Sequence, residues 1–226
     1  MNYLQLVQRL RLECGIPGSG PTTVIGNTGE MSRLCTWINQ AWTELQEYRP
    51  DWDWMRKDVS FNTIAGKNKY SPTTDILLSD FGQWKMDSFR IYPTSAGISS
   101  QILLQPYEYN GFRDSYLLAT RQTTLARPIA ISEAPDKSLV LGLVPDQEYT
   151  VTGEYFVTPV ELVLDTDTPL IPIRFHMAIV YKAMMKYGMY EAAAEVFQSS
   201  ENLLSSMLNR LEQNQTPMIT IGHSLI

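Results

Sequence analysis

The residues best suited to acid–base or metal chemistry are the two histidines, His176 and His223. A proton relay needs a nucleophile or carboxylate near the imidazole, and a zinc site needs further ligands at short spacing. The sequence around each histidine names no such partner. Glu108 with Asp114 is the least unfavourable acid–base pair for a hydrolase of cell-wall polymer, an enzyme hypothesis that we do not favour. We therefore expect a structural His176 and no catalytic, metal-binding or cofactor-binding residues.

Closely spaced carboxylates are a second kind of candidate. Asp51 with Asp53, and Asp165 with Asp167, have the spacing of adjacent ligands in a calcium loop. Neither pair continues into a loop with the glycine and distal glutamate of an EF-hand. We interpret both pairs as charges that solvate loops or helix ends.

Two further patterns are typical of phosphate or nucleic-acid binding. Residues 26–29 (Gly-Asn-Thr-Gly) precede a helix, where anions bind well, but no lysine follows at the P-loop position. Trp52, Trp54 and Trp84 could stack on bases, yet they lack basic neighbours, so a place in the core is expected. These patterns predict helix capping and packing.

The composition indicates a folded protein that does not grip DNA. Of 226 residues, 44% are hydrophobic and 19% charged, and the formal charge is −6. The basic residues are scattered, whereas a DNA-gripping surface needs clustered lysine and arginine. No apolar stretch approaches the roughly 20 residues that span a bilayer. The two cysteines, Cys14 and Cys35, fall in helix-like segments and are expected to be reduced, buried and apolar in role; a disulfide between them is the alternative.

The elements that position these residues begin with two helices. Leu4, Val7, Leu10 and Cys14 recur at helical spacing, which predicts a helix over residues 2–14. A loop rich in glycine, proline, serine and threonine follows, up to residue 29. Apolar spacing then predicts a second helix over residues 29–48, with Thr28 as its N-cap; it must end before Pro50.

From residue 56 to about residue 159 the pattern changes to short β-type runs. Residues 59–61 and 69–71 flank a turn sequence at 65–68 and predict a hairpin. Residues 149–157 alternate as a strand does, with Tyr149, Val151, Gly153, Tyr155 and Val157 on one face. Further strands are expected at residues 88–92, 101–104, 129–131 and 138–141, and a short helix followed by a loop at 107–119. Together these runs predict an antiparallel sandwich or barrel-like subdomain.

Helical spacing returns after residue 169. Pro172 suits the first position of a helix that Gly188 would close, and a last helix is expected over residues 190–213, on a stripe that includes Leu203. The short connection predicts an antiparallel hairpin. Residues 214–226 contain Pro217 and an alternating apolar run, which is costly in water unless something covers it.

The predicted fold is therefore α+β. Its N- and C-terminal helices form a four-helix bundle, and a long antiparallel β subdomain is inserted between them. We divide the chain into N-terminal helices (1–55), an inserted β-rich subdomain (56–168), a C-terminal helical hairpin (169–213) and an extended C-terminal tail (214–226).

The helical segments carry a family resemblance. Residues 29–46, 49–54 and 171–183, with the helix that continues to Leu211, resemble the head-to-tail adaptor (connector) family of tailed bacteriophages, which includes tail tubular protein A of short-tailed phages. Members have an Asn- and Trp-containing helix, a β excursion and two closing helices that form a bundle. The insertion is longer here than in many members.

The resemblance implies a structural virion protein, not an enzyme, in the neck or tail of the particle after assembly in the host cytoplasm. It implies a homo-oligomeric ring, usually a dodecamer, beneath the capsid portal. Such a ring extends the channel through which genomic DNA passes without specific binding, and it supports the next tail component, such as a nozzle or tail tube protein. C-terminal tails of the family reach into the portal, which implies these portal-binding residues: Pro217, Met218, Ile219, Ile221, Leu225 and Ile226.

A second function belongs to a different class. The β subdomain could be a carbohydrate- or receptor-binding tail module, with Tyr107, Tyr109 and Phe112 as exposed aromatic contacts.

Overall fold

Asn2 begins the first helix, α1 (Tyr3–Glu13), with a capping box. The Asn2 side chain accepts the backbone N–H of Gln5 at 2.9 Å, and the Gln5 side chain accepts that of Asn2 at 2.9 Å. The computed structural model describes residues 1–215. After the predicted loop, the second helix is α2 (Gly29–Glu47). Both N-terminal helices are confirmed. The buried face of α1 is centred on Leu6 and Leu10, and Leu4 and Cys14 are partly buried.

The C-terminal hairpin consists of α4 (His176–Tyr190) and α5 (Ala194–Gln215), preceded by a short 3-10 turn, η4 (Ile173–Phe175). Pro172 lies just before η4 and is not the first residue of the α-helix. The prediction that Gly188 closes the helix is also wrong, because α4 continues to Tyr190 and the chain reverses at Ala192 (φ 53°). Gly188 instead permits close packing: a Cβ there would lie 2.9 Å from the backbone nitrogen of Phe197.

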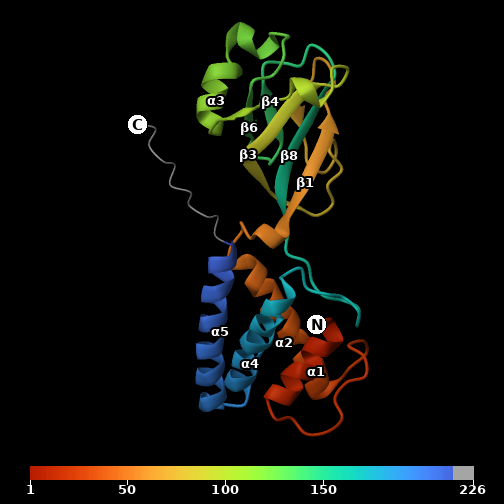
Figure 1. Ribbon diagram of the computed structural model, residues 1–226, viewed down its shortest axis with the longest axis vertical. Helices are drawn as coiled ribbons and strands as arrows, with labels where there is room; N and C mark the ends of the chain where they lie inside the picture. The colour runs from red at the N-terminus through yellow and green to blue at the C-terminus, as the bar shows by residue number, and fades with distance from the viewer. Residues whose placement is uncertain (216–226) are drawn as a thin grey trace. The chain divides into compact units, whose positions relative to one another are not determined.

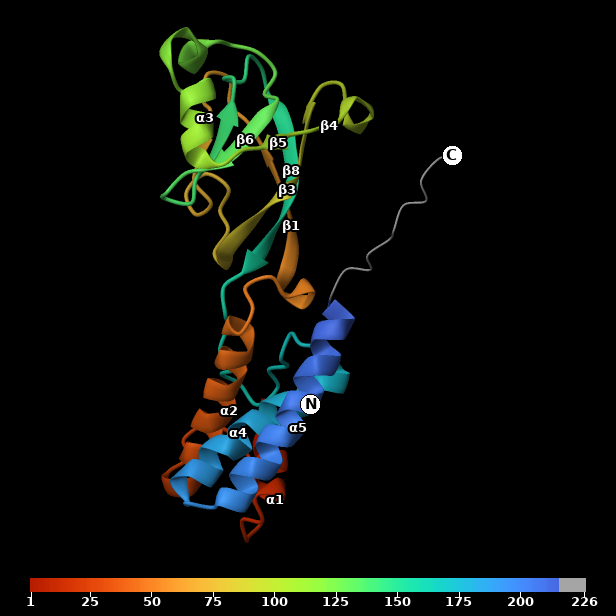
Figure 2. The ribbon, with the colours of Figure 1, turned by 90° about the vertical axis from the view of Figure 1, so that its left-hand side faces the viewer.

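The α-helices of the helical segments pack against one another mainly through α4 (Figures 1 and 2). Helix α4 contacts α1, α2 and α5, and α1 also contacts α2. The buried side of α5 is formed by Ser200, Leu204, Met207 and Leu211, whereas Leu203, predicted to be buried, is exposed. With the sheets described next, these helices confirm the α+β class.

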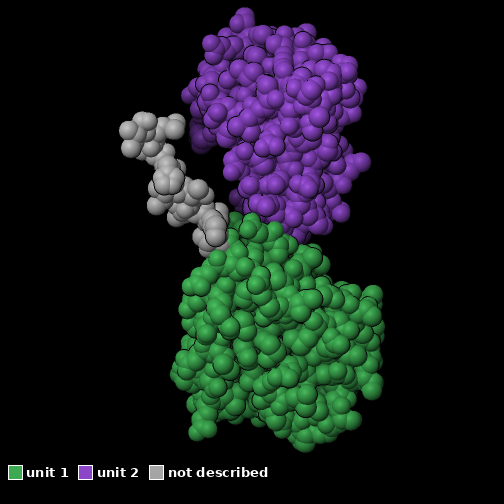
Figure 3. Space-filling view, viewed as in Figure 1, with its two compact units in different colours: residues 1–54, 159–226 green, residues 55–158 purple. Residues whose placement is uncertain are grey.

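The chain divides into two units, coloured separately in Figure 3. Met1–Trp54 and Pro159–Ile226 make the helical unit, and Met55–Thr158 makes the β unit. The first sheet of the β unit has the order β1-β8-β3-β4, and the second has the order β2-β7-β6-β5. Their bounds are β1 Arg56–Asn62, β2 Lys69–Tyr70, β3 Phe81–Pro93, β4 Ile102–Leu103, β5 Gln105–Pro106, β6 Ala130–Glu133, β7 Leu139–Gly142 and β8 Tyr149–Val157. Short 3-10 turns lie at η1 (Asp53–Met55), η2 (Ile98–Ser100) and η3 (Ala119–Thr123).

Strand pairing departs from the sequence prediction in two places. Strands β5 and β6 are parallel, so the sheets are not wholly antiparallel. The predicted hairpin is wrong, because β1 pairs with β8 in the first sheet and β2 pairs with β7 in the second. The turn between β1 and β2 therefore carries the chain from one sheet to the other.

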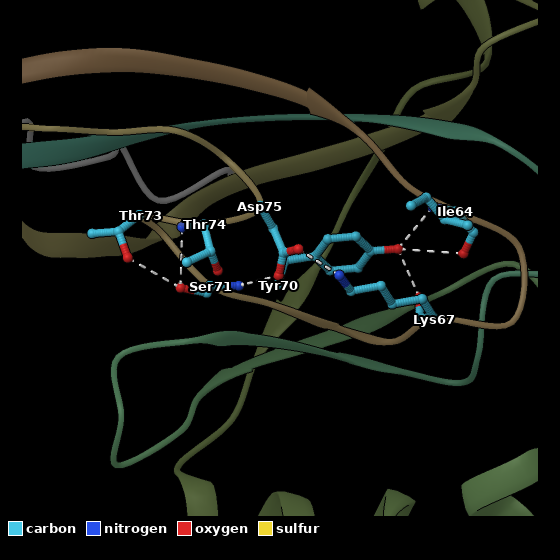
Figure 4. Close-up of polar contacts among 7 residues, drawn as sticks. All are labelled: Ile64, Lys67, Tyr70, Ser71, Thr73, Thr74 and Asp75. Carbon is cyan, nitrogen blue, oxygen red and sulfur yellow. Dashed lines mark hydrogen bonds and ion pairs between the residues drawn. The ribbon is translucent and has the colours of Figure 1, made fainter.

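Side chains stabilise this crossing (Figure 4). The Tyr70 hydroxyl accepts the backbone N–H of Ile64 at 2.9 Å and donates to the carbonyl of Lys67 at 2.7 Å. The Lys67 ammonium reaches the Asp75 carboxylate at 2.5 Å, and Asp75 also accepts the backbone N–H of Ser71 at 2.8 Å. These bonds satisfy backbone groups that no hairpin partner satisfies.

A bulge in β3 shapes the core of the first sheet. Lys85 pairs with Glu154 and Arg90 with Thr152, so the four residues of β3 between these pairs (86–89) lie opposite one residue of β8, Gly153. The Ser88 hydroxyl accepts the backbone N–H of Glu154 at 2.8 Å and stabilises the bulge. Within the bulge Phe89 is fully buried, and its ring occupies the space where Gly153 has no side chain.

Helix α3 (Tyr109–Tyr116) confirms the helix expected within residues 107–119. It packs on the second sheet, where Phe112 is buried with Ala130, Ala134 and Val140. Among residues 1–215, no helix combines the length and apolar character that crossing a membrane requires.

Candidate interaction surfaces

His176 is buried at the start of α4 and has two polar neighbours. Its Nδ1 lies 2.7 Å from the Met1 amino group, and its Nε2 lies 3.1 Å from the carbonyl oxygen of Ile171. Burial lowers the pKa of His176, and the nearby N-terminal ammonium group lowers it further. A buried, neutral imidazole with these partners packs and orients the chain, as a structural histidine does.

The lowered pKa of His176 predicts a pH-dependent stability. Because the unfolded histidine binds a proton more tightly than the folded one, the free energy of unfolding should fall as pH drops below about 6.5. A His176→Gln variant lacks this contribution, so its unfolding free energy should change less between about pH 7 and pH 5. Urea titrations of both proteins at each pH measure the difference; equal slopes with pH would contradict the prediction.

The paired aspartates have structural partners. Asp51 forms two bonds with Arg49, at 3.0 and 2.9 Å, and Asp53 begins η1. Asp165 accepts the backbone N–H of Val24 at 2.6 Å, while one Asp167 oxygen accepts two backbone N–H groups of the preceding turn. Within residues 1–215, no group of three or more His, Cys, Asp or Glu side chains is arranged to hold a metal ion.

The remaining sequence candidates lie in separate places. Glu108 caps α3, accepting N–H groups of Asn110 and Gly111, and these bonds lower the pKa of its carboxyl, the opposite of what a general acid needs. Tyr107 is exposed and Tyr109 is half-buried, but the prediction of an exposed Phe112 is wrong because Phe112 is in the core of the β unit. An aromatic sugar-binding face made of these three residues is therefore absent.

The tryptophans and the glycine-rich loop are also structural. Trp52 is fully buried and stacks with Trp54, at 5.9 Å between ring centroids, and Trp84 is buried in the β unit. Thr28 occupies the N-cap of α2, although its side chain forms no capping bond.

The cysteines form no disulfide. Cys35 is buried, whereas Cys14, predicted to be buried, is only partly so. Burial raises the pKa of the Cys14 thiol to about 12 and also raises that of Cys35, so both thiols stay protonated and unreactive at neutral pH.

A feature that the sequence reasoning missed joins the two halves of the helical unit. Residues 159–172, which we name the strap, run without regular secondary structure beside α2. The Gln46 amide accepts the N–H of Val160 at 3.0 Å and donates to its carbonyl at 3.1 Å. Asn39 makes the same pair of bonds with Leu162, at 2.9 and 2.8 Å. Two amide side chains of α2 thus pair with the strap as a neighbouring strand would.

The strap includes residues that the sequence analysis assigned to the inserted β-rich subdomain. Residues 159–168, assigned from the sequence to the inserted subdomain, lie in the helical unit. They also help to start α1, because the carbonyl oxygens of Asp167 and Asp165 accept the N–H groups of Tyr3 and Leu4 at 2.8 and 3.3 Å. Those helix-start donors have no partner within the helix itself.

A polar groove of about 790 Å³ lies along α2. Burial alone would raise the pKa of Glu44 in its wall, but hydrogen bonds from Lys186 and Lys182 outweigh burial and lower it. The two ammonium groups lie 2.5 and 3.0 Å from the Glu44 carboxylate and join α4 to α2. The lining residues are Tyr3, Val24, Gly26, Asn27, Ser32, Cys35, Thr36, Asn39, Gln40, Thr43, Glu44, Glu161 and Lys186.

Comparison with known families gives a match that spans both units. The family described as SU10 adaptor protein matches residues 1–221 of the chain. The chain belongs to this family. No curated protein matches the sequence. Membership in the SU10 adaptor family confirms the expectation of a bacteriophage adaptor and implies a virion component that interacts with other head and tail proteins.

The SU10 adaptor match extends into the tail, but the predicted portal-binding residues lie outside the described residues. What the structure adds for this adaptor is the strap, held by Asn39 and Gln46. A sequence signal existed: two amide residues seven positions apart flank the buried Trp42 on α2. Their partners, more than a hundred residues later in the chain, had no recognisable pattern.

Proposed function

We propose that this SU10 adaptor family member is a structural virion protein that forms a ring between the capsid portal and the tail. We further propose that the protein has no enzymatic activity. We also propose that it is related to tail tubular protein A of short-tailed phages. The observation that carries the proposal is the family match over residues 1–221, which includes both units and most of the tail. The ring is a dodecamer assembled in the host cytoplasm, with the four helices acting as a bundle at its core.

The charge distribution supports a channel role. The helical unit contains 8 basic and 13 acidic residues, a formal charge of −5, whereas the β unit contains 10 and 11, a formal charge of −1. A ring of helical units therefore carries most of the negative charge. Such a wall repels phosphate groups and lets genomic DNA pass without binding.

The tail gives the proposal its sharpest test. Residues 216–226 should contact the portal through the predicted residues between Pro217 and Ile226. Deleting them should abolish binding to purified portal rings, because no apolar segment would remain to enter the portal. The deletion begins after α5, so it preserves the bond between Arg174 and Asn214 at 3.0 Å and should leave the fold intact.

Binding is measured with the full chain and the truncated chain under identical conditions, and circular dichroism confirms that both are folded. A second variant replaces Met218, Ile219 and Ile221 with serine. It keeps the length of the tail and removes these apolar side chains, so it separates the effect of length from that of apolar character. Equal portal affinity of the full and truncated chains would contradict the assignment. Negative-stain images of the mixture should show coaxial stacked rings.

A further inference from the structure

The last turn of α4 and the facing part of α2 carry a preassembled cluster of aromatic side chains. We name Arg33, Trp37, Tyr187, Met189 and Tyr190 the hairpin-end patch. The Trp37 ring lies 6.1 Å from that of Tyr187 and 5.6 Å from that of Tyr190, and the Arg33 guanidinium lies 4.7 Å from the centre of the Tyr190 ring. These edge-to-face, tilted and cation–π contacts join α2 to the end of α4.

Much of this patch is exposed although its side chains are held in place. Tyr190 is 55% and Met189 is 63% exposed, while Trp37 and Tyr187 are half-buried beneath them. The core of the helical unit does not need these exposed surfaces. Trp, Tyr and Arg are the residues that contribute most binding energy in protein interfaces. Rings that already contact one another lose little conformational entropy when a partner binds.

Three acidic residues lie at the helix ends that adjoin the patch in the sequence. Glu30 begins α2, Glu191 ends α4 and Glu195 lies in the first turn of α5; all three are exposed, and none forms an ion pair within residues 1–215. Two of them lie near the rings: burial raises the pKa of Tyr187, and Cys14, Glu191 and Glu30 raise it further. An apolar centre with an acidic rim is complementary to an apolar side chain flanked by lysine or arginine.

The patch lies at the opposite end of α5 from the tail. Helix α5 has 22 residues and is therefore about 33 Å long. Its first turn is beside the patch, and its last residue, Gln215, precedes the tail; Figure 1 shows α5 extended alongside α4 between these two ends. The patch and Gln215, the residue that precedes the tail in the chain, therefore lie at opposite ends of α5.

We infer that the hairpin-end patch docks a basic segment of the next tail component, while the C-terminal tail serves the portal. This inference rests on the proposed adaptor function. A second copy of the chain is the competing occupant, and a contact between copies would reveal itself as a changed subunit number in the patch variants.

The test uses two purified probes from the same phage: the portal ring and the tail component that follows the adaptor. Tyr190→Ala should weaken binding to the tail component about tenfold or more. The double variant Glu191→Lys, Glu195→Lys should weaken it similarly, and added salt should weaken the wild-type interaction. Leu203→Ala, which removes an exposed apolar side chain elsewhere on α5, is the matched control and should bind as the wild type does.

Three results would overturn the inference. These are unchanged affinity of both variants for the tail component, loss of portal binding in its place, or a change in subunit number by light scattering, which would make the patch a contact between copies. Deleting residues 216–226 separates the two proposals. A truncated chain that loses the portal but keeps the tail component supports both, whereas one that keeps the portal contradicts the proposed role of the tail alone.

Discussion

Replacing Gln46 with leucine should lower the free energy of unfolding of the helical unit by about 2–3 kcal/mol. Gln46 is almost fully buried, and leucine is near it in size, so the main change is the loss of the amide that bonds Val160. The Val160 carbonyl keeps a bond of 2.7 Å from the Trp42 indole, but its N–H has no other partner. The bond is partly buried, so an N–H left without its partner adds a desolvation cost to the loss of the bond.

Asn39 tests the same mechanism independently. Asn39→Asp keeps an acceptor for the N–H of Leu162 but turns a second oxygen toward the Leu162 carbonyl, so it should destabilise about as much as Asn39→Ala. Gln40→Ala is the matched control. Gln40 is exposed and lies next to Asn39, and its side chain makes no hydrogen bond among the described residues. Its effect should stay within about 0.5 kcal/mol.

Urea unfolding gives the free energies, and hydrogen exchange locates the change. The backbone N–H groups of Val160 and Leu162 should lose protection in the Gln46 and Asn39 variants respectively, before the helices exchange. If Gln46→Leu were as stable as the wild type, or if protection of Val160 were unchanged, the strap would be held by its apolar contacts and not by the amides.

Gly153→Val should destabilise the β unit by about 2–3 kcal/mol, although valine favours strands more than glycine does. A Cβ at Gly153 would lie 2.5 Å from Cδ1 and 2.6 Å from Cε1 of Phe89. Phe89 is fully buried in the β3 bulge, so its ring would have to displace buried neighbours to make room. Overpacking of this kind outweighs the gain in strand propensity, which is at most about 1 kcal/mol.

A second substitution separates steric overlap from strand propensity. In the double variant with Phe89→Leu, the smaller side chain relieves the overlap, so the pair should cost about 1 kcal/mol less than the sum of the single variants. Gly111→Ala is the control: nothing lies within 4 Å of its Cβ position, and it lies inside α3, so alanine should stabilise the unit by about 0.5–1 kcal/mol. A stabilised Gly153→Val protein would contradict the steric argument.

The parts of the fold that local periodicity determines could be predicted from the sequence. Helix α2 and strand β8 match their predicted ranges closely, because an apolar stripe and strict alternation each specify one geometry. The pairing of the strands on either side of residues 65–68 could not be predicted correctly. The turn sequence is compatible with a hairpin, but β1 pairs with a strand about ninety residues later in the chain, and local sequence does not encode that choice.

Packing also gave single residues roles that their local sequence did not indicate. Gly188 resembles a helix terminator, yet it is required where α5 crosses close to α4. Candidate interaction sites were harder to predict than elements. Arg33 and Trp37 on α2 and Tyr190 on α4 are ordinary helix positions, and only the packing of α2 against α4 brings them together. The tail could be proposed as a contact from its composition alone, because its apolar residues have no helical stripe to join.

The division into two units fixes an order of events during synthesis. The β unit is one continuous stretch, Met55–Thr158, and its first and last strands pair with each other, so it can fold as soon as residue 158 has left the ribosome. The helical unit is discontinuous, and its N-terminal helices wait for α4 with Leu34, Ile38 and Leu45 uncovered. During synthesis we therefore expect a stage in which the β unit is folded while the apolar face of α2 is still exposed to solvent. Chaperone binding in the infected cell should concentrate on α2 during that interval.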